Sequence, residues 1–502
     1  MEAISIRAIA PQGGRETAEA ERAFERLMGW MASKQACVLP LHEVERREEE
    51  QIREVARLLL QEHINGRGQG VVGHGVKRVT GELLTEHRLR ERGYVSIFGK
   101  VTVRRVAYGA EGVRSLMPLD EQLNLPQRSY SYELQKRVTR QAALGPFAAA
   151  RETLTEWSGV SVPKRMVEAL AVEAAQDVAQ FYDHKPLSPD TPTSEVLVCA
   201  ADGKGVPLRR ESPKERPRRG RKGPKPGEKK MATVAAVYTI APYQRPPQEI
   251  VREVCREPSA EAATSSRPHP EHKRVWASLK KDKDTMFDEM AAEMHRRDPG
   301  RQKTWAFLCD GEEALQKRAR TVLGTVGATL YVILDLFHVL EYLWKVAYAF
   351  PPVGSPEAEQ WVSQQLLALL QGRVSRVVAS LCQSATKRGL HGQRRQAVDT
   401  AARYFLKNKT CMRYHEYLAL GLPIGSGAAE GACRNLIKDR LERTGMRWSV
   451  DGAEAVIQLR ATELSGAWEE YWHYHIEAQR RRLYPEHTWQ PAKTKPLLRQ
   501  VS

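Results

Sequence analysis

The chain has 502 residues and a net charge of +17, from 78 basic and 61 acidic side chains. This length is too great for one hydrophobic core, so we expect two to four domains, and the charge favours a polyanionic partner, with nucleic acid the leading candidate. Composition argues against a membrane protein, because charges interrupt the longest nearly apolar run (323–344), and against a disulfide framework or zinc ribbon, because the seven cysteines lie far apart without a Cys-x-x-Cys pair.

The N-terminal region is predicted to be mainly helical, with a small β element. Its first 16 residues lack the apolar segment of a secretory leader, so we expect a cytoplasmic protein. Residues from about 16 to 65 carry apolar side chains at helical spacings, and 94–106 indicate two short strands around the Gly99-Lys100 turn. We therefore predict an N-terminal helical region over 1–80.

Residues 131–182 are again helical in pattern and contain a candidate DNA-binding motif. The segment "LTEWSGVSVPKRMVEALAVEAA" has the helix, short glycine-containing turn and second helix of a helix-turn-helix. A plain helical hairpin would have the same spacing. We predict that 81–190 comprises the small β element and a helical, helix-turn-helix-like DNA-binding region.

A layered α/β region is predicted after the Pro- and Ser-rich stretch near residue 190. Strands alternating with helices indicate such a sheet. We assign 191–350 to the first part of this core, 351–420 to a helical insertion, and 421–502 to a C-terminal helix and helical tail. The predicted elements are the strands "EVLVCAAD", "MATVAAVYTI" and "QEIVREVCRE", a helix over about 272–297, the strand "TWAFLCDG", the helix "EEALQKRART", the strand "ATLYVILD" and a further helix.

Three carboxylates lie where the predicted elements could bring them together. Asp202 closes the first strand, Asp310 closes the fourth, and Glu430 lies in the first turn or so of a late helix. If the first and fourth strands are neighbours, their ends converge, and two aspartates with a glutamate from a helix can share divalent metal ions. Hard oxygen ligands favour Mg²⁺, with Mn²⁺ as a substitute. These three residues are our candidate catalytic and metal-binding set.

Each of these residues also has a structural interpretation. An Asp-Gly pair after a strand is usually a turn, and Glu430 could serve the dipole at the N-terminus of its helix. Asp335 and His338, in "LDLFHVLEYLW", end the fifth strand beside the fourth and compete for a role in the site. We expect them to form a buried hydrogen-bonded pair that steadies it.

A dense basic segment joins the first two predicted strands. Residues 209–230 contain eleven Lys or Arg and three Glu, a local charge of 11 − 3 = +8. We expect this segment to bind DNA phosphates beside the metals, in a salt-sensitive and sequence-independent way, although a disordered linker would have the same composition. Trp448 could stack on an unpaired base or belong to the core. The predicted DNA-binding residues are Arg209, Arg210, Arg216, Arg218, Arg219, Arg221, Lys222, Lys225, Lys229, Lys230, Arg434, Lys438, Arg440, Arg447 and Trp448.

Four motifs together resemble a known family. "CAADGKGVP", "FLCDGEEAL", "LDLFHVLEYLW" and "LPIGSGAAEGACRNLIKDRLERTGMRW" are similar to motifs of bacterial insertion-sequence transposases of the DDE class, most closely the ISKra-type family, with the strongest likeness over about 195–462. The resemblance implies an RNase H-like catalytic core with a large helical insertion, and Asp202, Asp310 and Glu430 as its metal-binding triad. It does not decide between Asp310 and Asp335 as the second aspartate; strand order favours Asp310.

The resemblance predicts a transposase that cuts element ends and joins 3′-hydroxyls to target DNA by two-metal chemistry. Its partners would be double-stranded DNA, as terminal inverted repeats and target, and at least a second copy of the chain, because two ends must be handled together. The alternatives are a catalytically inactive, transposase-derived DNA-binding protein and a structure-selective RNase H-like nuclease.

Overall fold

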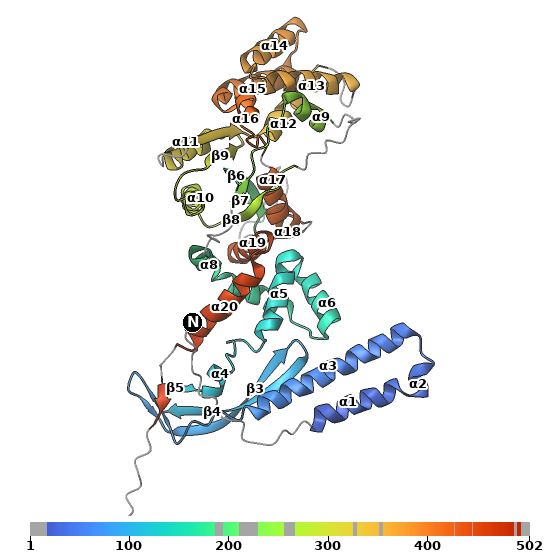
Figure 1. Cartoon of the computed structure of the whole chain (residues 1–502), viewed down its shortest axis with the longest axis vertical. Helices are drawn as coiled ribbons and strands as arrows, with labels where there is room; N and C mark the ends of the chain where they lie inside the picture. Colours follow the sequence, from blue (N-terminus) through green and yellow to red (C-terminus); the bar gives the residue numbers. More distant parts are fainter. Residues whose placement is uncertain are drawn as a thin grey trace, which may run out of the picture. The chain divides into compact units, whose positions relative to one another are not determined.

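The computed structural model divides the chain into two compact units (Figure 1). Unit 1 comprises Met1–Asp177 and Glu469–Ser502, and unit 2 comprises Val178–Trp468. No helix among the described residues is long and apolar enough to cross a membrane. The structure describes residues 18–185, 194–209, 229–255, 267–324, 329–350, 355–425, 427–443, 445–485 and 489–492.

Unit 1 begins with a hairpin of helices. Ala20 and Ala23 on the first helix pack with Val55 and Leu58 on the third, and this confirms the helices predicted between about 16 and 65. Apolar side chains three residues apart lie on the same side of a helix, so each helix presents one stripe to the other. The helices are α1 (Ala18–Met31), α2 (Lys34–Cys37) and α3 (Leu41–Gly66).

Two three-stranded sheets follow in unit 1. The antiparallel hairpin of β3 and β4, with Ser96 opposite Gly99, confirms the predicted small β element, and both strands are longer than expected. In the other sheet, β1 pairs with β2 and also with β11, which comes from the far end of the chain. The strands are β1 (Val76–Arg78), β2 (Leu83–Leu84), β3 (Glu86–Ser96), β4 (Gly99–Ala110), β5 (Val113–Leu116) and β11 (Trp489–Pro491).

Three helices of unit 1 pack on one another and contain the predicted helix, turn and helix. Helix α6 ends at Gly159, whose φ of +65° lies in the left-handed region that glycine adopts readily. Helix α7 then begins after Pro163, and buries Val167 and Leu170. The helices of this part are α4 (Pro118–Gln122), α5 (Tyr132–Leu144), α6 (Phe147–Ser158) and α7 (Lys164–Ala175).

Helix α20 (Trp468–Leu483) belongs to unit 1 from Glu469 onward, and its Tyr471 hydroxyl donates to Ala174 O near the end of α7. Buried Asp177 accepts hydrogen bonds from Arg482 of 2.6 and 2.7 Å, and its Oδ2 lies 2.7 Å from His475 Nδ1. Burial raises the pKa of Asp177, but the hydrogen bonds from Arg482 and His475 outweigh it, so the net pKa is lowered. The carboxylate therefore stays ionised and links two distant parts of the sequence.

A five-stranded sheet forms the centre of unit 2, in the order β10-β9-β6-β7-β8. β6, β9 and β10 run parallel, whereas β7 is antiparallel to both β6 and β8. The predicted α/β sheet is confirmed, and its first and fourth strands are neighbours. The strands are β6 (Val196–Pro207), β7 (Lys229–Ile240), β8 (Glu271–Ser278), β9 (Thr304–Cys309) and β10 (Leu330–Leu334).

Three predictions about these elements were wrong. "QEIVREVCRE" is largely the helix α9 (Pro247–Val254), because Pro247 starts a helix and Ile250 and Val251 give it a buried side. The third strand is β8, which lies almost entirely inside the range predicted to be a helix and pairs with β7. β6 does not end at Asp202 but continues to Pro207, because β7 pairs with it along its whole length.

Helices α10, α11, α17 and α19 pack on the sheet, and further helices follow β10 where a helical segment was predicted. The helices of the insertion, α13 to α16, fall within the expected residues 351–420. The helices of unit 2 are α8 (Val178–His184), α9, α10 (Lys283–Arg297), α11 (Glu313–Val322), α12 (Leu336–Ala347), α13 (Pro356–Leu370), α14 (Val374–Lys387), α15 (Gly392–Lys407), α16 (Tyr414–Ala419), α17 (Gly427–Ala432), the π-helix Cys433–Lys438, α18 (Asp439–Leu441) and α19 (Val450–Leu464).

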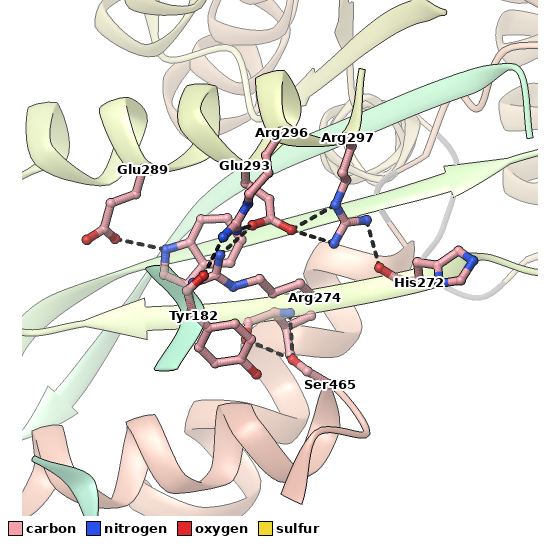
Figure 2. A network of polar contacts seen from close by, with 10 residues as sticks. Tyr182, His272, Arg274, Glu289, Glu293, Arg296, Arg297 and Ser465 are labelled. Atoms are coloured by element: carbon pink, nitrogen blue, oxygen red, sulfur yellow. Dashed lines mark hydrogen bonds and ion pairs between the residues drawn. The ribbon is translucent and has the colours of Figure 1, made fainter. Parts of the chain in front are cut away.

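A buried ionic network fastens α10 to the sheet edge (Figure 2). Glu293, 2% exposed, accepts from Arg274 of β8 over 2.5 Å and from Arg297 over 2.7 Å, and it also pairs with Arg296. The guanidinium of Arg274 lies 3.9 Å from the ring centroid of Tyr182, on α8. One carboxylate therefore holds three arginines between a helix and a strand.

Candidate functional site

The strand register brings three aspartates to corresponding positions near the carboxyl ends of the paired parts of three parallel strands. Ala200 of β6 lies opposite Leu308 of β9, and the same offset (308 − 200 = 108) leads from Asp202 to Asp310. Cys309 lies opposite Leu334 of β10, and that offset (334 − 309 = 25) leads from Asp310 to Asp335. The register therefore places Asp202, Asp310 and Asp335 side by side, where the three parallel strands cease to pair.

Asp202 is half-buried and is tied to the late helical segment. Its Oδ1 accepts a hydrogen bond from the backbone N–H of Gly203 at 2.6 Å, and its Oδ2 accepts from the thiol of Cys433 at 3.0 Å. Cys433 is the first residue of the π-helix, which packs on β6 and follows α17 without a break. π-Helical turns are frequent at functional sites. The thiol therefore links the late helix to the strand of Asp202.

Glu430 lies on α17, which packs on β6 and β7. It precedes Cys433 by three positions, close to one helical turn, so the two residues share a side of the helix. Its side chain lies outside the part of the chain that the structure describes. The backbone geometry thus brings the position of Glu430, through Cys433, to the strand of Asp202.

Asp310 follows β9 in a tightly held turn. Its Oδ1 accepts from the backbone N–H of Glu312 at 2.9 Å, and its carbonyl oxygen accepts from the Tyr404 hydroxyl at 2.7 Å. The next residue, Gly311, has a φ of +91°, which disfavours a side chain there. The carboxylate is half-buried at the end of its strand.

Asp335 is more buried than Asp202 and Asp310, and it caps a helix. It is 2% exposed and caps α12, because its Oδ1 accepts from the backbone N–H of Phe337 at 2.8 Å. Its own N–H donates to Cys309 O at 2.9 Å. His338 lies in the first turn of α12 and is half-buried. Helix capping is therefore a sufficient structural reason for an aspartate at position 335. Asp310 does not cap a helix, because its carboxylate accepts only within the turn that follows β9.

The donor set of the two half-buried aspartates suits a hard divalent cation. Carboxylate oxygens are the ligands that Mg²⁺ and Mn²⁺ take, and the two aspartates lie at corresponding positions of adjacent strands. Among the residues whose side chains are described, no three His, Cys, Asp or Glu residues form a group that could hold a metal ion. A third ligand would have to come from Glu430, whose side chain is outside that set.

The ends of the basic segment are anchored to the chain that follows Glu430. Arg209 donates from its backbone to Trp448 O at 2.7 Å and from Nε to Arg447 O at 3.2 Å. Lys229 Nζ lies 2.5 Å from Glu442 Oε1. Lys230, Arg434, Lys438 and Arg447 are exposed. The other predicted residues of this segment, Arg210, Arg216, Arg218, Arg219, Arg221, Lys222 and Lys225, lie outside the described residues.

Two predicted DNA-binding residues belong to the core instead. Arg440 is 0% exposed, and burial, with the nearby charge of Arg460, lowers its pKa to about 9. Its guanidinium lies 4.8 Å from the ring centroid of Trp448, and the indole N–H of Trp448 donates to Leu441 O at 3.1 Å. Neither side chain is available to DNA, because the two pack on each other beneath the surface.

Sequence reasoning missed two residues that contact the candidate site. Cys433 is absent from the predicted site residues, although its spacing of three from Glu430 was an available signal. Nothing in the sequence indicated that Tyr404 contacts the site, because it lies on α15, 94 positions after Asp310. Both contacts depend on tertiary packing that the local pattern does not contain.

Comparison with known proteins gives little. No family model matches the chain, and no curated protein does. Among solved structures, a Drosophila P element transposase strand transfer complex is similar at 11% identity and a TM-score of 0.26, covering 68% of this chain and 81% of that one. A likeness this weak establishes neither the fold nor the activity of this chain.

Proposed function

We propose that the chain is a DDE-class DNA transposase, which cleaves insertion-element ends and joins their 3′-hydroxyls to target DNA. The observation that carries the proposal is the contact between Cys433 and Asp202, which brings the helix of Glu430 to the strand beside Asp310. Two aspartates on adjacent parallel strands and a glutamate position on a packed helix can supply the carboxylate oxygens of a two-metal site. The mixed five-stranded sheet, with α13 to α16 as its insertion, supports an RNase H-like core.

Asp202, Asp310 and Glu430 would hold Mg²⁺, or Mn²⁺ as a substitute. When bound, such ions activate a water or a 3′-hydroxyl and stabilise the leaving oxygen of a phosphodiester. The chain itself orients the ligands: the Gly203 N–H and the Cys433 thiol fix the Asp202 carboxylate, and the Glu312 N–H fixes that of Asp310. The proposed partners are double-stranded DNA, as element ends and target, and a second copy of the chain, because two ends must be joined.

Exposed cations after Glu430 are proposed to hold the DNA backbone near the site. We expect Arg434→Ala and Lys438→Ala each to weaken binding to all duplexes alike, and each to lower the slope of log affinity against log salt by about 1. Salt titrations of fluorescent duplexes measure both effects. Arg394→Ala, which removes an exposed charge from α15, is the control. If it lowers the slope equally, the effect of Arg434→Ala and Lys438→Ala comes from net charge alone and not from a local DNA contact.

The three-helix part of unit 1 is proposed to read element ends through α7. Lys164 and Arg165 are exposed in the first turn of that helix, the region that enters the major groove in helix-turn-helix proteins. We expect Arg165→Ala to reduce the preference for element ends over random duplex by about 1–3 kcal/mol. Competition binding measures this preference. Arg137→Ala on the exposed side of α5 removes the same charge and should leave the preference unchanged; equal losses would exclude a reading role for α7.

The proposed function is tested with the full chain and labelled duplexes that carry the DNA flanking its own coding sequence. Cuts at the element boundary and joining to a second duplex, both dependent on Mg²⁺ or Mn²⁺, are expected. Tight binding without cleavage would instead identify a transposase-derived DNA-binding protein. Cleavage of branched DNA without any need for defined ends would identify a nuclease.

A further inference from the structure

We propose that Tyr404, on helix α15 of the helical insertion, is a positioning residue for the Asp310 carboxylate. This inference rests on the proposed function, in which Asp310 is a metal ligand. The Tyr404 hydroxyl donates to the carbonyl oxygen of Asp310 over 2.7 Å, so it holds the peptide that joins Asp310 to Gly311. Side chains that orient metal ligands from outside the ligand set are important for metal affinity.

The turn after β9 is built to receive this hydroxyl. A Cβ atom at Gly311 would lie 2.9 Å from Tyr404 Oη and 2.9 Å from Asn408 Nδ2, so only glycine allows α15 to approach so closely. On the other side of the turn, the Glu312 N–H holds the Asp310 carboxylate oxygen Oδ1. The peptide and the carboxylate of Asp310 are therefore fixed by two independent hydrogen bonds.

The phenol of Tyr404 is itself held in place. Its ring stacks on Tyr342 of α12, with centroids 4.0 Å apart and planes at 19°. The Asn408 side chain donates to Tyr404 O at 3.0 Å and accepts from Gln316 of α11 at 2.7 Å.

The insertion supplies a matched residue at the neighbouring strand. The Tyr414 hydroxyl donates to Leu334 O at 2.8 Å, the carbonyl just before Asp335. Tyr404 and Tyr414 thus make the same kind of bond, of nearly the same length, to the ends of β9 and β10. Replacing either by Phe removes one oxygen atom and keeps the ring, so the two variants differ in which aspartate loses its support.

The test compares Tyr404→Phe and Tyr414→Phe in the full chain. Three quantities are measured: the Mn²⁺ dissociation constant without DNA, by electron paramagnetic resonance of free Mn²⁺; the Mg²⁺ concentration for half-maximal cleavage; and the midpoint of thermal unfolding. We expect Tyr404→Phe to raise both metal quantities about 10–100-fold. Tyr414→Phe is expected to lower the unfolding midpoint as much as Tyr404→Phe does and to leave both metal quantities unchanged.

Each other outcome counts against the proposal. Unchanged metal quantities in Tyr404→Phe, with or without a lower unfolding midpoint, would show a merely structural hydroxyl. A rise in Tyr414→Phe alone would transfer the role to Asp335. Failure of the proposed function is distinguishable, because a wild-type chain that cuts no DNA still gives a Mn²⁺ dissociation constant, against which the two variants are compared.

Discussion

Asp202→Asn is expected to abolish strand cleavage while duplex binding stays close to that of the wild type. The carboxylate supplies a charged metal ligand, and an amide cannot replace its charge. Loss of several kcal/mol of transition-state stabilisation, at 1.36 kcal/mol per tenfold in rate, corresponds to a decrease of about 10³-fold or more. Asp310→Asn and Glu430→Gln are expected to behave alike. Gel assays of cleavage and binding on the same labelled ends measure both properties.

Two control variants separate this effect from general damage. Asp451→Asn changes an exposed carboxylate that pairs with Lys280 at 2.6 Å, and full cleavage is expected. Asp335→Asn keeps an oxygen that can cap α12 and removes only the charge that the helix dipole favours, so a loss of at most about 1 kcal/mol in stability is expected, without a loss of chemistry. Wild-type cleavage in all three triad variants would refute the proposed site, and a chemical defect confined to Asp335→Asn would make Asp335 the second aspartate.

Glu293→Gln is expected to destabilise unit 2 by about 3–5 kcal/mol, because it leaves the charges of Arg274, Arg296 and Arg297 without their buried partner. The loss of stability is measured by hydrogen exchange of the β8 and α10 amides and by unfolding in urea. Glu289→Gln, on the same helix, is the control: Glu289 is 32% exposed and pairs with Lys281, so a loss of at most about 1 kcal/mol is expected.

The same carboxylate gives the unit a pH dependence at the acid end. Burial raises the pKa of Glu293, but the charges of Arg274, Arg297 and Arg296 outweigh it and hold the value at about 2, against 4.5 for an unperturbed glutamate. Its contribution is complete above the unfolded value and is lost as the pH falls from about 4.5 through about 2. In Glu293→Gln this part of the acid sensitivity is expected to disappear. An unchanged acid profile would assign the sensitivity to other carboxylates.

Much of the fold follows from local pattern, and the failures have physical causes. The parallel strands were predictable because each contains a short apolar run that is followed by an aspartate. β8 was not, because only its second half is buried, and its first half, "EHKR", has the polarity of an exposed helix. The length of β6 depends on its pairing with β7, so the strand continues past Asp202 through residues that resemble a turn.

The part of the site that depends on the order of the strands could be predicted from the sequence. A short apolar run followed by Asp-Gly is visible in the sequence, so Asp202 and Asp310 could be named although β6 continues past Asp202, and the register puts them at corresponding positions. Burial within an irregular segment is not visible: Arg440 and Trp448 have the composition of a nucleic-acid surface but pack on each other. Contacts across 94 positions, such as that of Tyr404, require the fold to be known.

The chain order of unit 1 determines when that unit can be finished during synthesis. β1 needs β11 for one of its edges, and Asp177 needs His475 and Arg482, yet all of unit 2 is translated between these partners. Domains generally fold as they emerge from the ribosome. Unit 2 is therefore fully translated first, and the N-terminal part of unit 1 waits for α20 and β11. Unit 1, which contains the helices α6 and α7 that are proposed to read element ends, is thus assembled only in molecules that already carry the entire sheet of the proposed catalytic core.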